Sequence, residues 1–413
     1  MTRGSTSPAH RLQNHSGEPA QGEEGKSALH VSSTQAVAFR LARHHLSERA
    51  PATALARVAA DMAGAQAQVL SAAQISMWAR TGVTDVEDVD DAIWRERTLV
   101  RAWAMRGTMF LFPSDELAFY SRGVHRRSAY NLRWAQEQVA SEDALDGLLD
   151  DVAEALNEPR TRSDLARILE SRGYRLKSKP GGGWGDSRAV PWIEVGEASL
   201  SVGFLLHLVG ARDVICSGPS EGNESTYVRA ARWVPGWKDV RIEEAEGWLV
   251  ARYLRSFGPA TLEDFALWAG MYIRDAKEIW ALQSGNMVQV EVDGQKGYVL
   301  RSDVFELDDA KTDGQTVRLL PFFDSFLLGH RSHLNIVDEV NHKKVYRGQG
   351  WVSPVLLVDG QARGVWSQVR GKNRLEVRVS AFTRLPASVR ERVSEEAAEL
   401  GRFLGCPDVK TTI

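Results

Sequence analysis

A pattern that recurs three times constrains the fold of this chain more than any other feature of its sequence. Each copy has a turn that begins at Pro51, Pro159 or Pro259, and the copies are 108 and 100 residues apart. The turn carries a Ser or Thr helix cap and lies between two helical segments. A further helix and a pair of strands follow, at residues 97–112, 214–231 and 287–300. Because this is the order of a winged helix-turn-helix, the sequence predicts three tandem winged-helix units.

Composition divides the rest of the chain. Residues 1–32 are rich in Ser, Gly, Gln, Glu and His but nearly lack aliphatic residues, which predicts a disordered tail. The three units are then assigned to residues 33–120, 121–240 and 241–314, with a polar loop at 217–225. Strand-like segments from Thr316 and a last helix at 387–404 indicate a C-terminal antiparallel β-barrel-like domain over 315–413. The predicted fold class is therefore α+β.

The connector between the second and third helices of the first unit carries the chemical signal, Gln66-Ala67-Gln68. One helix is expected to end near Ala63-Gly64, and residues 71–74 have the form of a capping box for the next helix. In extended backbone, residues two apart point the same way, so both amides can face one cleft. An amide pair can hold and polarise a water without being a strong base. The alternative is that both glutamines only satisfy loop backbone or cap the next helix.

Three separated segments together resemble a known family. They are GAQAQVLSAAQISMWAR at 64–80, VRAWAMRGTMFLF at 100–112 and LLPFFDSFLLGHRSH at 319–333. This combination resembles the tandem winged-helix DNA glycosylases of the AlkZ and YcaQ type, which include azinomycin-resistance and interstrand-crosslink glycosylases. That family carries Gln-apolar-Gln or Gln-apolar-Asp at the first segment, and Gln66-Ala67-Gln68 has the first form. The resemblance extends from about residue 34 to the C-terminus.

The resemblance implies hydrolysis of the N-glycosidic bond of alkylated bases of the N7-guanine type, bulky natural-product adducts or interstrand crosslinks, in antibiotic self-resistance or DNA repair. An alkylated purine is cationic and leaves as a neutral base, while the sugar becomes oxocarbenium-like. Placing a water near C1′ is then the main task, and Gln66 and Gln68 are the predicted catalytic pair. Every lysine lies in a polar run, so a monofunctional glycosylase without a lyase step is expected.

Basic residues cluster although the formal net charge is −3. Residues 160–188 hold eight Lys or Arg against three acids, and residues 122–133 hold four arginines and no acid. One polarised face can bind phosphates, whereas solvated helix faces are the alternative. The predicted DNA-binding residues are Arg106, Lys177, Lys179, His330, Arg331, Lys343, Lys344, Arg370 and Lys372.

Two of these residues have structural alternatives. Arg106 can instead pair with Asp90 or Asp91, and Arg331 can instead pair with Asp324. The glycine-rich loop at 181–185 lacks the Gly-Lys-Ser/Thr ending of a phosphate loop, which argues against nucleotide hydrolysis.

Several classes of protein are disfavoured by composition. Cys216 and Cys406 are too few for a disulfide scaffold or a thiolate metal site, so we expect a cytoplasmic protein with no metal and no other cofactor. No apolar run approaches the roughly 18 residues that cross a membrane, so no membrane partner is expected. The expected partner is double-stranded DNA carrying alkylated bases, bound by a monomer.

Two other functions stay open at this stage. A winged-helix transcriptional regulator would bind DNA without catalysis, usually as a two-fold dimer with one reading helix per subunit. A drug-sequestering resistance protein would use the 13 tryptophans as an apolar lining. The sequence does not identify the adduct, nor whether a base is flipped.

Overall fold

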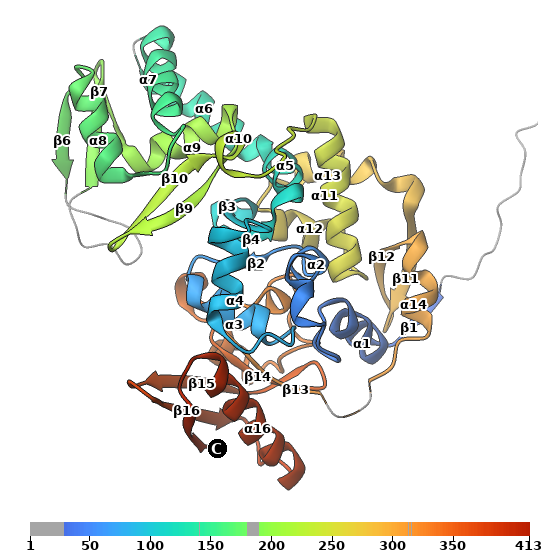
Figure 1. Ribbon diagram of the computed structural model, residues 1–413. Helices are drawn as coiled ribbons and strands as arrows, with labels where there is room; N and C mark the ends of the chain where they lie inside the picture. The colour runs from blue at the N-terminus through green and yellow to red at the C-terminus, as the bar shows by residue number, and fades with distance from the viewer. Residues whose placement is uncertain (1–28, 140, 180–189, 313, 315) are drawn as a thin grey trace, which may run out of the picture.

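Three segments of helices and hairpins and then a C-terminal sheet follow one another in the computed structural model (Figure 1). The structure describes residues 29–139, 141–179, 190–312, 314 and 316–413. The β15–β16 hairpin and α16 lie at one end of the molecule, whereas α7, α8 and β6 lie at the other (Figure 1). The predicted α+β class is confirmed. None of the described helices has the length and apolar character that crossing a membrane would require.

The first segment contains the predicted helix before the connector. Its elements are α1 (Ser33–Arg43), η1 (Ala52–Ala54), α2 (Leu55–Asp61), β2 (Ala65–Gln66), α3 (Leu70–Trp78), α4 (Val86–Asp90), η2 (Asp91–Arg95), β3 (Leu99–Trp103), η3 (Met105–Gly107) and β4 (Met109–Pro113). Ala63 and Gly64 have φ of 53° and 88°, which ends α2 where the sequence predicts. The predicted Thr cap at Thr53 is wrong, because Thr53 lies inside η1 and no side chain caps α2.

The second segment has an inserted sheet between two of its helices. Its elements are η4 (Ser114–Glu116), α5 (Leu117–Gly123), α6 (His125–Gln138), α7 (Glu142–Ala155), β5 (Arg160–Thr161), α8 (Arg162–Ser171), β6 (Leu176–Lys179), β7 (Val190–Val195), β8 (Ala198–Ser201), α9 (Val202–Arg212), β9 (Ile215–Glu221), β10 (Glu224–Arg229) and α10 (Ala230–Trp233). Thr161 caps α8 in a capping box with Asp164, as the repeat predicts. The predicted polar loop at 217–225 is wrong, since β9 and β10 extend to a tight turn at Gly222.

The third segment repeats the cap and the hairpin. Its elements are α11 (Ile242–Phe257), α12 (Leu262–Ala269), α13 (Ile273–Ala281), η5 (Ser284–Asn286), β11 (Met287–Val292), β12 (Gln295–Leu300), η6 (Arg301–Asp303) and α14 (Val304–Asp308). Thr261 caps α12 with Asp264. In both later segments the residue after the turn pairs with the second hairpin strand, β5 with β10 and Ala260 with Tyr298. In the first segment, Ala50 before the turn pairs with Thr81, which does not belong to a hairpin strand. Because the first segment lacks the pairing seen in the other two, the organisation into three winged-helix units stays a prediction.

Strand pairing links segments that the sequence treats as separate. The hairpins of the first two segments form one six-stranded sheet, ordered β2-β4-β3-β9-β10-β5, through the pair Ala102 and Cys216. A short strand β1 (Leu29–Val31) adds in parallel to β11. The predicted tail over residues 1–32 is therefore wrong for residues 29–31, because the edge of the hairpin offers backbone partners to them. Residues 1–28 lie outside the described residues.

The C-terminal domain is an open sheet with one parallel pair. Its elements are β13 (Val317–Leu320), η7 (Ser325–Leu327), α15 (His342–Val345), η8 (Gly348–Gly350), β14 (Val355–Val358), β15 (Gln361–Arg370), β16 (Arg374–Ala381), α16 (Ala387–Phe403) and β17 (Asp408–Thr412). The strand order is β13-β14-β15-β16-β17. The predicted antiparallel domain is confirmed for β13 to β16, but β17 joins β16 in parallel, which corrects the prediction.

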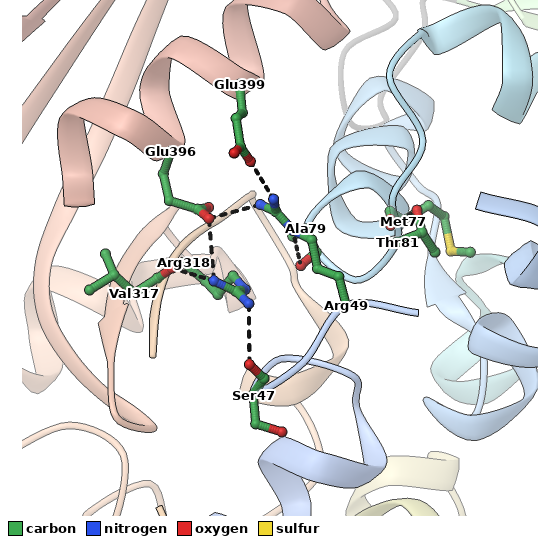
Figure 2. Close-up of polar contacts among 9 residues, drawn as sticks. All are labelled: Ser47, Arg49, Met77, Ala79, Thr81, Val317, Arg318, Glu396 and Glu399. Atoms are coloured by element: carbon green, nitrogen blue, oxygen red, sulfur yellow. Dashed lines mark hydrogen bonds and ion pairs between the residues drawn. The ribbon is translucent and has the colours of Figure 1, made fainter. Parts of the chain in front are cut away.

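The first segment and the C-terminal domain share one hydrophobic core. That core contains Val58, Met77 and Trp78 of α2 and α3 together with Leu319, Val355 and Leu400 of the C-terminal domain. Polar contacts join the same two parts near the surface. Arg49 pairs with Glu396 and Glu399 of α16 and donates to the carbonyl of Ala79, while Arg318 donates to Glu396 and to Ser47 (Figure 2).

A fully buried ion pair joins these two parts at their centre. Arg80 follows α3, and its two terminal nitrogens donate to the carboxylate of Asp324 at 2.9 and 2.6 Å. Both side chains are 0% exposed. Asp324 also accepts from the Ser76 hydroxyl at 2.7 Å and from the backbone N–H of Phe326. The predicted alternative of an ion pair between Asp324 and Arg331 is therefore wrong.

Replacing Asp324 with Asn should lower the free energy of unfolding by about 3–5 kcal/mol, because the guanidinium of Arg80 would stay buried without its counter-charge. Urea denaturation followed by far-UV circular dichroism measures the change. The matched control is Arg95→Met, which breaks an exposed pair with Asp91 and should cost less than about 1 kcal/mol. Equal losses for the two variants would contradict the importance of the buried pair.

Candidate active site

Gln66 lies on β2, an edge strand of the six-stranded sheet, and Gln68 follows that strand. Gln66 pairs with Phe110 of β4, and the N–H of Ala67 donates to the carbonyl of Met109 at 2.7 Å. The backbone therefore pairs with β4 as far as Ala67, but the prediction of extended backbone is wrong at Gln68, where the chain bends. The predicted capping box at residues 71–74 is wrong: α3 begins at Leu70 without a side-chain cap, and Gln74 donates to Asp90 instead.

The two amides differ in exposure and in hydrogen bonding. Gln66 is 7% exposed, and its side-chain oxygen is buried with no hydrogen-bond partner among the described residues. Gln68 is exposed, and its side-chain oxygen accepts from the backbone N–H of Met109 at 3.3 Å. This bond is the kind expected if Gln68 only satisfies the hydrogen bonding of loop backbone. It leaves the NH₂ group of Gln68 available as a donor, whereas Gln66 offers an acceptor.

Ser325 connects the C-terminal domain to this strand. Its hydroxyl accepts from the N–H of Gln66 at 3.3 Å and donates to the carbonyl of Gly64 at 2.7 Å. Gly64 has φ of 88°, and a Cβ there would lie 2.5 Å from the ring of Phe112, so only glycine fits. Because Ser325 follows the buried Asp324, the ion pair with Arg80 also positions the strand that carries the glutamines.

Arg101 of β3 supports the connector from the other side of β4. Its Nε donates to the carbonyl of Ala67 at 3.0 Å, and its Nη2 lies 3.5 Å from the carbonyl of Gln68. Burial lowers the pKa of Arg101. Sequence reasoning missed Arg80, Arg101 and Ser325 as supports of the site, although all three lie inside the segments that carry the family resemblance.

Arg106 bonds to a backbone carbonyl of the third segment. Its own backbone is left-handed with φ of 56°, and its guanidinium donates to the carbonyl of Trp268 at 2.6 Å. Burial lowers the pKa of Arg106 to about 10. A Cβ on Gly270 would lie 2.7 Å from the Cα of Arg106, which shows how closely η3 packs against the end of α12. The predicted pairing of Arg106 with Asp90 or Asp91 is therefore wrong, and its DNA contact stays a prediction.

His330 is a buried structural residue rather than a DNA contact. It is 8% exposed, and its Nε2 lies 3.4 Å from the carbonyl of Pro259. Burial and the nearby Arg40 lower the pKa of His330 to about 3. The next residue, Arg331, donates its backbone N–H to the α12 cap residue Asp264 at 2.7 Å. The Arg331 side chain is exposed, so its contact with DNA stays a prediction.

The other predicted DNA-binding residues lie on three separate elements. Lys177 of β6 pairs with Glu194, and the side chain of Lys179 and the loop at 181–185 lie outside the described residues. In α15, Lys343 is exposed, and Lys344 donates to Asn341. Arg370 and Lys372 are exposed at the turn between β15 and β16. The structure does not bring these elements into contact with the glutamines, and their DNA contacts stay predictions.

Titratable groups and metal ligands are scarce around the glutamines. In the part of the chain that the structure describes, no carboxylate forms a hydrogen bond with Gln66 or Gln68, and no group of three His, Cys, Asp or Glu side chains is arranged to hold a metal ion.

Known proteins match this chain over most of its length. Residues 59–403 match the model of the family described as DNA glycosylase AlkZ-like. The interstrand DNA cross-link repair glycosylase of Streptomyces sahachiroi is 29% identical over 390 residues, covering 91% of this chain and 98% of that protein. The solved structure of Streptomyces sahachiroi DNA glycosylase AlkZ superposes with a TM-score of 0.74 at 26% identity, covering 93% of this chain and 100% of that chain.

The buried His330 predicts a pH-dependent stability. Its pKa is about 3 in the folded protein but about 6.5 in an unfolded chain, so below pH 6.5 the unfolded state binds a proton that the folded state does not. Stability should therefore fall as the pH decreases from 6.5 towards 3, by up to about 1.4 kcal/mol per pH unit from this residue.

Urea denaturation of the wild type and of His330→Asn between pH 7 and pH 5 tests this expectation. The variant should lose less stability than the wild type over this range. His30→Asn is the control, since the His30 side chain is 67% exposed and its loss should leave the pH dependence unchanged. If the free energy of unfolding depended on pH equally in His330→Asn and in the wild type, the assignment of His330 as a neutral buried histidine would be wrong.

Proposed function

Because the chain belongs to the AlkZ-like DNA glycosylase family, we propose that it hydrolyses the N-glycosidic bond of alkylated bases in double-stranded DNA, with Gln66 and Gln68 as the catalytic pair. The observation that carries this proposal is the family's Gln-apolar-Gln motif, with Gln66 on the edge strand β2 and Gln68 directly after it, beside the buried core. The coarser conclusion, that the chain is a DNA glycosylase and thus a hydrolase acting on N-glycosyl bonds, follows from the family itself.

The two amides complement each other in the proposed reaction. In the proposed reaction, a water admitted beside the buried, unpartnered oxygen of Gln66 donates a hydrogen to that oxygen and accepts one from the NH₂ group of Gln68. One lone pair of that water then remains for C1′ of the sugar. Because a base alkylated at a ring nitrogen is already a good leaving group, orienting the water and stabilising the oxocarbenium-like sugar suffice without a strong base.

The substrate is proposed to be an N7-alkylguanine type of lesion, a bulky natural-product adduct or an interstrand crosslink, removed in antibiotic self-resistance or DNA repair. The name of the Streptomyces relative refers to interstrand crosslinks, which supports this range of substrates. A monofunctional reaction is supported by the lysines, since every lysine with a described side chain is exposed and none is desolvated for Schiff-base chemistry.

The proposed organisation is a monomer that binds DNA through three winged-helix units. The caps at Thr161 and Thr261 and the pairing of β5 and Ala260 with the following hairpins support this interpretation for the second and third units. The first unit keeps the hairpin but not the cap, and its connector carries the glutamines instead.

The double variant Gln66→Ala plus Gln68→Ala should release alkylated base at least about 10²-fold more slowly than the wild type, because the water loses both of its positioning groups. Mass spectrometry of bases freed from an N7-alkylguanine duplex measures the rate. Gln74→Ala is the matched control: it removes an equally buried glutamine of the same unit, whose amide bonds to Asp90, and should retain release.

If the double variant released base as fast as the wild type, Gln66 and Gln68 would not be the catalytic pair. A wild-type protein that frees no base but protects a specific DNA sequence would instead be a regulator. Tryptophan quenching by free drug without DNA would support sequestration.

A further inference from the structure

The four arginines at the end of α5 and along α6 fall into two groups. Arg122 and Arg126 are neutralised: Arg122 pairs with Asp239, and Arg126 pairs with Glu246 and Glu278. Arg127 and Arg133 are exposed and form no ion pair with any residue that the structure describes. Arg122 and Arg126 hold α5 and α6 against their neighbours. Arg127 donates to the carbonyl of Gly270 at 3.5 Å, which leaves its charge uncompensated, so Arg127 and Arg133 can bind an anion from solution.

Aromatic and polar side chains accompany the two free arginines. The guanidinium of Arg133 lies 4.7 Å from the centre of the Tyr130 ring. The hydroxyl of Tyr130 donates to Asp275 at 2.7 Å and accepts from Arg274 at 2.9 Å. Tyr272 is 70% exposed and meets Tyr130 edge to face. We call this set the α6 surface; its members are Arg127, Tyr130, Arg133, Tyr272 and Arg274.

The α6 surface reaches the β3–β4 turn next to the catalytic strand. A Cβ on Gly107 would lie 3.3 Å from the Nε of Arg127. Two residues further along, the N–H of Met109 donates to the side chain of Gln68. Because two residues span at most about 7 Å, the guanidinium of Arg127 lies within roughly 14 Å of the Gln68 side chain.

Hollows on both sides of Arg127 leave room for a ligand beside it. One is lined by Tyr130, Asn131 and Tyr272, and the other by Trp103, Asn131 and His207. Arg127 thus lines both hollows and is exposed.

We propose that Arg127 and Arg133 bind DNA phosphates within several nucleotides of the base that is removed. Each DNA strand carries one negative charge per 3.4 Å of helix axis, so a span of about 14 Å covers about four nucleotides. A guanidinium matches the geometry of a phosphate in two parallel hydrogen bonds. This inference rests on the proposed function and adds the residues that position the DNA over the glutamines.

The salt dependence of binding to an undamaged duplex tests the inference without requiring catalysis. Fluorescence anisotropy between 50 and 200 mM salt gives the slope of log affinity against log salt. Arg127→Gln and Arg133→Gln should each reduce that slope by about 0.9, and the double variant by about 1.8. Arg127→Lys keeps the charge and should keep the slope, which separates a lost phosphate contact from a misfolded protein.

Arg301→Gln is the matched control, since Arg301 is equally exposed and forms no ion pair within the described ranges, but lies on η6. It should leave the slope unchanged. If log affinity fell with log salt as steeply in the double variant as in the wild type, the inference would be wrong. It would also be wrong if Arg301→Gln reduced this slope as much as Arg127→Gln does. A reduced slope in a protein that frees no base would keep the α6 surface and reject the glycosylase assignment instead.

Discussion

The buried ion pair between Arg80 and Asp324 is the interaction on which the arrangement of the site depends. Both side chains are fully buried, and each would be an uncompensated charge in an apolar core without the other. The pair joins the end of α3 to the loop that follows β13, so the first segment and the C-terminal domain cannot separate without exposing it. These two parts of the chain therefore act as one folding unit around a shared core.

The ion pair also fixes the strand that carries the glutamines. Ser325 follows Asp324 and bonds to both Gly64 and Gln66, while Arg101 bonds to the carbonyl of Ala67 from β3. An edge strand has unpaired backbone on one side, which makes it mobile unless other groups bind it. Here residues from three parts of the chain hold it, and a reaction that depends on the placement of one water requires such rigidity.

Charge in this protein is divided between structure and surface. Arg80 and Arg126 pair with carboxylates, whereas Arg127, Arg133 and Arg331 are exposed without ion pairs among the described side chains. A formal net charge of −3 says little about DNA binding, because many acids are already paired with structural arginines. The positions of exposed arginines without ion pairs determine where a phosphate backbone can bind.

Features that depend on neighbouring residues can be predicted from the sequence. These include the end of α2 at Ala63-Gly64, the caps at Thr161 and Thr261 and the extended backbone at Gln66. Tertiary structure alone decided the partner of Asp324, the burial of Arg106 and His330, and the parallel strands β1 and β17. Arg80 and Asp324 are 244 positions apart, and no local pattern records which distant group will neutralise a buried charge. The type of a residue determines which groups its side chain can bind, whereas packing determines whether water, DNA or protein reaches that side chain.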